Sequence, residues 1–276
     1  MKSIKITKNT ECCISIASSP GNFGSFIFNQ TFKALSLDFI YKPFRVNPDN
    51  LSGSIHGIRA LNIRGCGVSM PYKTIVHKYL DMIDHTAKEV GAINTIVNKN
   101  GVLTGYNTDV VGAEKALEKY YPVKDRTAHI IGAGGVARAI IVALKKNLCK
   151  EIILSNRDEK KAQKISKEFN ITYCSNKMRK QIKADVFINA TPVGMAPLDQ
   201  KMIIDENELK KYHAIMDVVV SPIHTKLIKV AKRERKISIS GYIMAIHQAA
   251  AQFTLYTGKE APLNIMMRYA KNIPYP

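Results

Sequence analysis

The sequence predicts an α/β protein of two domains separated by a cleft, and three observations support this fold class. A chain of 276 residues is long enough for two hydrophobic cores. Short apolar runs alternate with helical patterns in the second half, which is typical of a parallel sheet with helices on both faces. A glycine-rich turn joins the first of these runs to its helix, in the segment 127–138.

In the first half, apolar runs also alternate with helical patterns. We predict strands at 12–17, 39–44 and 66–69, and helices at 26–35, 48–61 and 70–80. The polar residues 1–10 are expected to be frayed. Asn100-Gly101 is a strong turn signal, so residues 92–98 and 102–106 are predicted to form a hairpin.

The sequence pattern of the second half predicts six strands with helices between them. The strands are expected at 128–131, 151–154, 171–174, 185–189, 214–219 and 237–240. A long apolar helix at 242–256 has no strand after it, and we expect it to cross back and complete the first domain. The predicted domains are therefore 1–108, 109–240 and a returning segment at 241–276.

Composition limits the class of protein. No apolar run is long enough to span a bilayer, and the N-terminus lacks the apolar core of a signal peptide, so we expect a cytoplasmic protein with no membrane partner. Five cysteines form an odd set without C-x-x-C spacing, which argues against a disulfide framework or a zinc site. No H-E-x-x-H motif occurs among the seven histidines, so no metal is predicted.

The net charge of +19 could indicate a nucleic-acid partner. The lysines are scattered along the chain, however, and only 229–236 is dense, where they fit the exposed face and end of a helix. We therefore prefer composition bias combined with attraction of anionic small molecules, and we expect no nucleic acid to bind.

The glycine-rich turn has the context of a dinucleotide-binding motif. The apolar run 128–131 is followed at once by Gly132-Ala133-Gly134-Gly135-Val136-Ala137 and then by a helical pattern. Gly132 permits the tight turn, Gly134 lets a pyrophosphate approach the backbone, and Ala137 lets the helix pack closely. The helix N-terminus presents N–H groups to phosphate.

The next strand indicates which dinucleotide binds. An NAD site usually carries an acid at this strand end, to bind the ribose 2′-hydroxyl. Here the strand ends in Ser155-Asn156-Arg157, and an arginine fork suits a 2′-phosphate. The second domain is therefore predicted to be a Rossmann-type NADP-binding domain, and the first an N-terminal α/β substrate domain. The alternative is that Arg157 is a solvated residue at a strand end.

Hydride transfer to or from an alcohol also needs a group that moves the hydroxyl proton. Lys73 and Asp109 are the candidates, with the carboxylate orienting the ammonium. A lysine would need its pKa lowered from about 10.4 to act as a base near neutral pH. The alternatives are that Lys73 is a solvated residue in a first helical turn and that Asp109 caps the following helix.

Seven motifs occur together in one order: 68–73 (VSMPYK), 91–95 (GAINT), 106–109 (YNTD), 132–137 (GAGGVA), 155–157 (SNR), 189–192 (NATP) and 248–250 (QAA). This order resembles the shikimate dehydrogenase family over nearly the whole chain. The combination is much more specific than any single motif.

The resemblance implies roles for individual residues. Lys73 and Asp109 would be the catalytic pair, and Asn94 and Gln248 would hold the ring hydroxyls of a cyclic polyol, with Ser69 and Asn22 as further substrate-binding residues. The implied cofactor-binding residues are Gly132, Gly134, Gly135, Ala137, Asn156, Arg157, Asn189, Ala190, Thr191, Val218 and Gly241. The alternatives are that Asn94 and Asn189 satisfy backbone groups and that Gln248 is a polar residue on a core helix.

Departures from the family pattern cluster around the substrate carboxylate. The usual Ser-x-Ser of the first loop is Asn22-Phe23-Gly24, a tyrosine position is Val220, and Asn-Val-Thr has become Gly67-Val68-Ser69. The usual Gly-x-Gly before the last helix is Gly241-Tyr242-Ile243. The sequence is therefore most similar to the shikimate dehydrogenase-like branch. Asn22 and the serines at 18, 19 and 25 could rebuild an anion site.

Two functions follow as hypotheses. The first is an NADP-dependent oxidoreductase of the shikimate pathway, acting on 3-dehydroshikimate/shikimate or a related cyclic polyol carboxylate, as a monomer or homodimer. The second is an NADP(H)- or metabolite-binding sensor with little turnover, which the altered carboxylate site motivates.

Overall fold

The computed structural model describes residues 6–271. Residues 1–5, half of the stretch expected to be frayed, lie outside the described residues. Contacts divide the chain into two units, one with residues up to Thr108 and from Gln248 onward, the other with Asp109–His247. The division falls inside one continuous helix, α9 (Gly241–Thr257). A sequence pattern gives no sign of such a division, because the helix has no break there.

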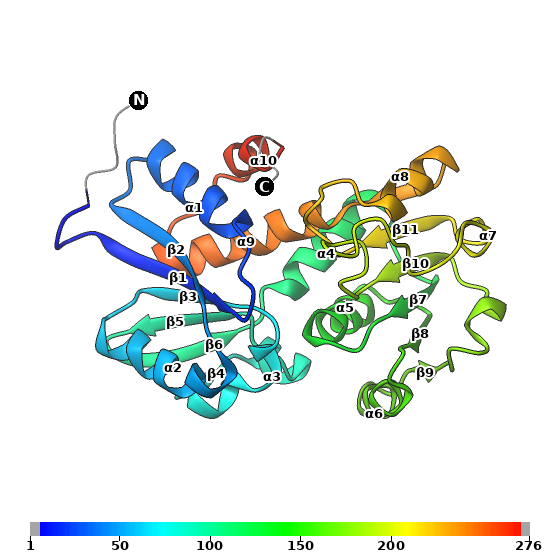
Figure 1. The fold of residues 1–276 in the computed structure, drawn as a ribbon, viewed down its shortest axis with the longest axis horizontal. Helices are drawn as coiled ribbons and strands as arrows, with labels where there is room; N and C mark the ends of the chain where they lie inside the picture. Colours follow the sequence, from blue (N-terminus) through cyan, green and yellow to red (C-terminus); the bar gives the residue numbers. More distant parts are fainter. Residues whose placement is uncertain (1–5, 272–276) are drawn as a thin grey trace. The chain divides into compact units, whose positions relative to one another are not determined.

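The first unit contains a mixed six-stranded sheet with the strand order β2-β1-β3-β5-β6-β4 (Figure 1). Its strands are β1 (Glu11–Ala17), β2 (Phe39–Arg45), β3 (Gly65–Val68), β4 (Met82–Ile83), β5 (Thr95–Lys99) and β6 (Val102–Tyr106). β2, β1 and β3 run parallel, and the predicted hairpin is confirmed as antiparallel β5 and β6. Asn100 and Gly101 both have positive φ angles, as a tight hairpin turn requires.

The helices of this unit include α1 (Phe23–Ala34), α2 (Leu51–Ala60), α3 (His85–Val90) and α10 (Leu263–Ala270). One core forms where Ile14 and Ile16 of β1 pack with Leu51, Ile55 and Ile58 of α2. α1 contacts both β2 and α10. These contacts give the first unit a packed scaffold, and this unit also contains the cavity lined by Lys73 and Asn94.

One predicted helix is corrected. The segment 70–80 forms two short 3₁₀ helices, η2 (Tyr72–Thr74) and η3 (Val76–Tyr79), instead of one α-helix. Ile75 between them has φ −117° and ψ −18°, away from ideal α-helical values, and separates the two turns. Tyr72 and Val76 are both fully buried and anchor one turn each. The sequence did not predict β4, α3 and α10. β4 and α3, with two and six residues, are too short for a periodic pattern.

The second unit contains a parallel six-stranded sheet with the order β12-β11-β10-β7-β8-β9 (Figure 1). Its strands are β7 (Thr127–Ile131), β8 (Glu151–Ser155), β9 (Thr172–Tyr173), β10 (Val186–Asn189), β11 (Ala214–Asp217) and β12 (Ile237–Ile239). Successive strands step outward from β7 in one direction and from β10 in the other. This is the doubly wound order of a dinucleotide-binding sheet, as predicted.

The helices of this unit are α4 (Asp109–Tyr120), α5 (Gly135–Lys146), α6 (Glu159–Phe169), α7 (Glu206–Leu209) and α8 (Lys226–Arg233), together with the start of α9. In α8, Leu227, Ile228, Val230 and Ala231 are buried while Lys229 and Lys232 are exposed. The dense basic segment is thus a solvated helix face, as the sequence predicted. Among residues 6–271, no helix is both long and apolar enough to cross a bilayer.

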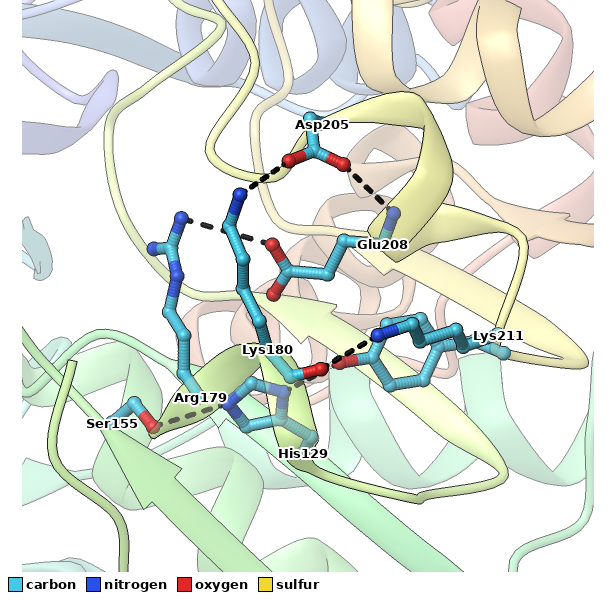
Figure 2. A network of polar contacts seen from close by, with 8 residues as sticks. His129, Ser155, Arg179, Lys180, Asp205, Glu208 and Lys211 are labelled. Carbon is cyan, nitrogen blue, oxygen red and sulfur yellow. Dashed lines mark hydrogen bonds and ion pairs between the residues drawn. The ribbon is translucent and has the colours of Figure 1, made fainter. Parts of the chain in front are cut away.

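A buried polar cluster lies inside the second unit (Figure 2). His129 of β7 bonds the Tyr212 hydroxyl at 2.8 Å and the Ser155 hydroxyl at 3.1 Å. Burial lowers the pKa of His129 to about 3, so the ring is neutral at physiological pH. Beside it, the Glu208 carboxylate is 2% exposed, lies 3.8 Å from Arg179 and has no hydrogen-bond partner among the described residues.

Candidate active site

A cavity of about 210 Å³ lies in the first unit, at the ends of β1 and β3 and beside α1 and α9. Its polar lining includes most of the predicted substrate and catalytic residues of this unit. The polar side chains are Ser15, Ser19, Tyr41, Ser69, Lys73, Asn94, Gln248 and Gln252. Among the lining residues within 6–271, Lys73 is the only charged one.

The backbone at Lys73 is held by contacts with segments distant in the sequence. The preceding Tyr72 is fully buried, and its hydroxyl donates to the Val46 carbonyl. The Lys73 carbonyl accepts a hydrogen bond from the Ile93 N–H at 2.7 Å, next to Asn94. The half-buried lysine therefore starts from a fixed backbone, which is what a proton-transfer group requires.

Asn94 is fixed by a network of neutral side chains. Its Nδ2 donates to the Thr108 hydroxyl at 3.0 Å, and its Oδ1 accepts from the Thr108 N–H and the Thr95 hydroxyl, both at 2.8 Å. Asn94 is 3% exposed. Asn94 therefore has both of the roles that the sequence left open: its side chain satisfies a backbone N–H and also lines the cavity.

Gln248 joins the same network from α9. Its Nε2 donates to the Thr108 hydroxyl at 3.1 Å. One turn further along α9, the Nε2 of the buried Gln252 donates to the Thr95 hydroxyl at 2.8 Å and to the Asn94 carbonyl at 3.3 Å. These bonds orient the two predicted polyol-binding amides with respect to each other.

The sequence analysis missed three members of this network: Thr95, Thr108 and Gln252. Thr95 and Thr108 lie in the motifs 91–95 and 106–109, next to Asn94 and Asp109. Gln252 follows Gln248 by four residues, on the same face of a helix. That spacing was the available signal. The sequence does not show, however, that Gln252 bonds Thr95, because the two residues are 157 positions apart.

Asp109 belongs to the second unit. It is the first residue of α4 and is 5% exposed. A carboxylate in the first turn also interacts favourably with the helix dipole, so the capping alternative retains a physical basis. Pairing of Asp109 with Lys73 remains a prediction.

Asn22 and Ser25 lie outside the cavity lining. Asn22 is exposed at the start of α1, and its carbonyl accepts a hydrogen bond from the Ser25 hydroxyl at 3.0 Å. Of the serines considered for a rebuilt anion site, Ser19 is a lining residue. The role of Asn22 in substrate binding stays a prediction.

The predicted pyrophosphate loop connects β7 to α5. Gly132 has φ +131°, and a Cβ there would lie 2.6 Å from the Ala190 carbonyl oxygen, so only glycine fits. Gly134 is the N-cap of α5 without a side-chain cap, and a Cβ on it would meet nothing within 4 Å. Ala137 is fully buried. An uncapped helix start with open space beside it suits a phosphate.

The end of β8 carries the residues predicted to select NADP. Arg157 is exposed and Asn156 half-buried, with the Asn156 Nδ2 donating to the Asp158 carbonyl at 3.0 Å. Of the two acids that follow this strand end, Asp158 and Glu159, Asp158 is nearer in the sequence, and its carboxylate accepts from the Lys161 N–H as the N-cap of α6. Because that carboxylate caps a helix, it is not available as a ribose ligand of the NAD type.

The loop after β10 is tied together by Asn189. Its Nδ2 donates to the Val193 carbonyl and to the Asp217 carboxylate, each at 2.9 Å, while its Oδ1 accepts from the Thr191 N–H and hydroxyl. The Asn189 side chain therefore shapes the loop, which is the alternative that the sequence left open. Ala190 and Thr191 are half-buried and follow it at the strand end.

Asp217 ends β11 and is fully buried. Burial raises its pKa to about 6, although Thr225, Asn189 and the Val219 N–H all donate to the carboxylate. Beyond it, Gly241 packs so closely on the chain that a Cβ would lie 2.5 Å from the Val218 carbonyl carbon. The structure thus brings the predicted residues Val218 and Gly241 together.

The predicted cofactor residues all lie at or after the carboxyl ends of neighbouring strands: β7, β8, β10, β11 and β12. The order of the sheet reverses between β7 and β10, where Gly132 contacts Ala190. Open α/β sheets bind their ligands at such a switch point. The geometry of this unit therefore fits a dinucleotide.

Three family profiles match the chain. The shikimate dehydrogenase substrate binding domain matches residues 18–96 and the shikimate / quinate 5-dehydrogenase profile matches residues 113–234. The shikimate 5′-dehydrogenase C-terminal domain matches residues 241–268.

Known proteins are similar over nearly the full length. A shikimate dehydrogenase (NADP(+)) of Halothermothrix orenii is 40% identical over 251 residues, covering 86% of this chain and 87% of that protein. A shikimate dehydrogenase-like protein of Haemophilus influenzae is 35% identical and covers 91% of this chain and 92% of its own. This chain belongs to the shikimate dehydrogenase family. A crystal structure of a shikimate dehydrogenase in complex with NADP⁺ has a TM-score of 0.89 at 34% identity and covers 97% of both chains.

Membership of the shikimate dehydrogenase family confirms the resemblance found in the sequence, and it makes the altered positions informative. Gly24 and Gly67, which stand where the family pattern has serine and asparagine, both line the cavity. Val220, in the tyrosine position, is half-buried in the second unit. The first two changes leave room in the cavity that another side chain can occupy.

Proposed function

We propose that this chain catalyses NADP-dependent, reversible hydride transfer between NADP(H) and 3-dehydroshikimate/shikimate or a related cyclic polyol carboxylate. The observation that carries the proposal is the cavity of the first unit, where Lys73 stands with Asn94 and Gln248. One cation and two oriented amides suit a ring with several hydroxyls. We assign this reaction to the alcohol dehydrogenases of the shikimate dehydrogenase type, in aromatic amino acid biosynthesis, and similarity to a protein named shikimate dehydrogenase (NADP(+)) supports the assignment.

The residues divide the work between proton transfer and orientation. Lys73 donates a proton to the carbonyl oxygen during reduction and takes it back from the hydroxyl during oxidation, and Asp109 orients the ammonium. Asn94 and Gln248 hold neighbouring hydroxyls, and the Thr108 hydroxyl fixes both amides. Bound NADP(H) supplies or accepts the hydride.

NADP is the cofactor, as in relatives named shikimate dehydrogenase (NADP(+)) and in the similar structure with NADP⁺, and the second unit fits it. The start of α5 offers N–H groups and space to the pyrophosphate, with Gly134 and Gly135 at the contact. The Arg157 guanidinium binds the 2′-phosphate, while Asp158 is committed to α6. Arg157→Ala is expected to weaken NADP⁺ binding about ten- to a hundredfold and to leave NAD⁺ binding nearly unchanged. Calorimetric titration with both dinucleotides measures this difference.

The reaction is tested by NADPH absorbance with shikimate and quinate as substrates. We expect NADP⁺ reduction with at least one of them. Tight NADP(H) binding by folded protein, with no reduction of the dinucleotide by either compound, would instead support the sensor. A gel shift at low salt checks nucleic-acid binding, which we expect to be absent, and gel filtration distinguishes monomer from homodimer.

A further inference from the structure

Tyr41 lines the cavity but has no role in the reaction as proposed so far. It lies in β2 and is 6% exposed. Its ring stacks on Phe28 of α1, with centroids 4.6 Å apart and planes inclined by 4°. Such a stacked, buried ring has little freedom to swing away from its position.

The backbone of Tyr41 is clamped as well. The Asn29 Nδ2 donates to the Tyr41 carbonyl and the Asn29 Oδ1 accepts from the Tyr41 N–H, both at 2.8 Å. Asn29 and Phe28 are adjacent residues of α1, so one helix fixes both the backbone and the ring. The position of the Tyr41 hydroxyl is therefore a fixed property of the cavity.

Two glycines make room for this hydroxyl. A Cβ at Gly67 would lie 2.8 Å from the Tyr41 Oη, closer than real Cβ atoms come. A Cβ at Gly24 would lie 3.5 Å from the same oxygen. The Tyr41 hydroxyl thus stands close to the place that a serine hydroxyl at position 24 would reach, and it excludes a side chain at position 67.

Ser15 completes a pair of hydroxyls. It lies in β1 and pairs with Gly67 of β3, and a Cβ at Gly67 would lie 3.3 Å from the Ser15 Cβ and 2.8 Å from the Tyr41 Oη, so the two side chains are neighbours. A hydrogen bond between the two hydroxyls would use one of their two hydrogens, so at least one remains for a ligand in the cavity. Burial raises the pKa of Tyr41, which keeps its hydroxyl protonated and able to donate.

We propose that the hydroxyls of Tyr41 and Ser15 receive the carboxylate of the substrate. This inference rests on the proposed function, in which Lys73, Asn94 and Gln248 bind the ring hydroxyls. A carboxylate accepts hydrogen bonds and offers none, so it fits a site that has a hydroxyl hydrogen to donate. The pair would then replace the serine hydroxyls that this chain lacks at positions 22 and 24.

Tyr41→Phe tests the pair, because it removes the hydroxyl and keeps the stacked ring. We expect the KM for shikimate to rise about ten- to a hundredfold, and the KM for the neutral carboxamide of shikimate to rise by a smaller factor. The double variant Tyr41→Phe/Gly24→Ser returns a hydroxyl to nearly the same place and should recover part of the loss. Tyr79→Phe, outside the cavity lining, is the matched control and should match the wild type.

Equal changes for shikimate and the carboxamide, or no change for either, would overturn the assignment. If the wild type reduces no NADP⁺ with either compound, the proposed reaction fails, and calorimetric binding of shikimate then tests the pair alone. Weaker shikimate binding by Tyr41→Phe than by the wild type would still support it. Identical binding, or none by the wild type, would refute it.

Discussion

The two units bury polar side chains in different ways. In the first, Asn94, Thr95, Thr108 and the two glutamines of α9 are neutral, and they bond one another beside the cavity. The second also has a neutral cluster around His129, but it buries two acids besides: Glu208 has no hydrogen bond among the described residues, and Asp217 has three donors. Burying a neutral, satisfied group costs little, whereas burying a charge costs several kcal/mol.

This difference suggests which cluster serves chemistry and which serves structure. The neutral network fixes amides that a ligand can reach without adding a charge to the cavity, where Lys73 is the charged group. The carboxylates of the second unit bear on stability and on its pH dependence. Substitutions in the two places should therefore change different measured quantities.

The largest effect is expected at Lys73. Lys73→Ala removes the proton-transfer group, so kcat should fall by orders of magnitude while NADP⁺ affinity is nearly unchanged. Stopped-flow or steady-state NADPH absorbance gives kcat, and calorimetry gives the affinity. Lys78→Ala, at an exposed lysine of η3, is the control. Parallel losses of turnover and NADP⁺ binding would mean misfolding rather than lost chemistry.

The second effect is the pH dependence of stability through Asp217. Its folded pKa of about 6 lies above its ordinary value of 3.8, so its contribution is full below pH 4 and is lost as pH rises through 6. A shift of about 2 units corresponds to at most about 3 kcal/mol.

Urea unfolding between pH 4 and pH 8 measures this contribution as the difference between wild type and Asp217→Asn. The variant should lack the decline with rising pH that the carboxyl causes. A wild-type profile parallel to that of the variant would contradict the raised pKa.

A smaller effect is expected from Thr108→Val, which removes the hydroxyl shared by Asn94 and Gln248 without changing side-chain shape. Leaving buried donors without this acceptor should cost about 1–3 kcal/mol of unfolding free energy. kcat/KM for shikimate should fall roughly tenfold because both amides lose their fixed orientation. Thr108→Ser keeps the hydroxyl and should retain most activity; an equal loss in both variants would argue against the network.

The smallest effect is expected at Glu208. Glu208→Gln removes a buried charge, and Arg179 keeps contact with solvent, so stability near neutral pH should change by about 1 kcal/mol or less, toward higher stability. Burial raises the pKa of Glu208, so the gain should shrink as pH falls and the wild-type carboxyl protonates. Thermal unfolding measures the change in stability. A decrease of several kcal/mol in the unfolding free energy would show that the ion pair with Arg179 is needed for stability.

How much of this the sequence predicts depends on the range of the interactions. The glycine turn at 132–137, the hairpin at 100–101 and the parallel strands of the second unit are local patterns, and they were predicted correctly. The contacts of Thr108 with Gln248 and of Tyr41 with Gly67 join distant segments, and no local periodicity encodes them. The turns at Tyr72 and Val76 had helical spacing, but tertiary burial of each residue determined the backbone.

The cap formed by Asp158 bears on any change of cofactor. Its carboxylate accepts a hydrogen bond from the Lys161 N–H at the start of α6. Under the role proposed for Arg157, replacing that arginine alone would not create a ribose ligand of the NAD type, because recruiting Asp158 would also cost about 1 kcal/mol for the lost cap.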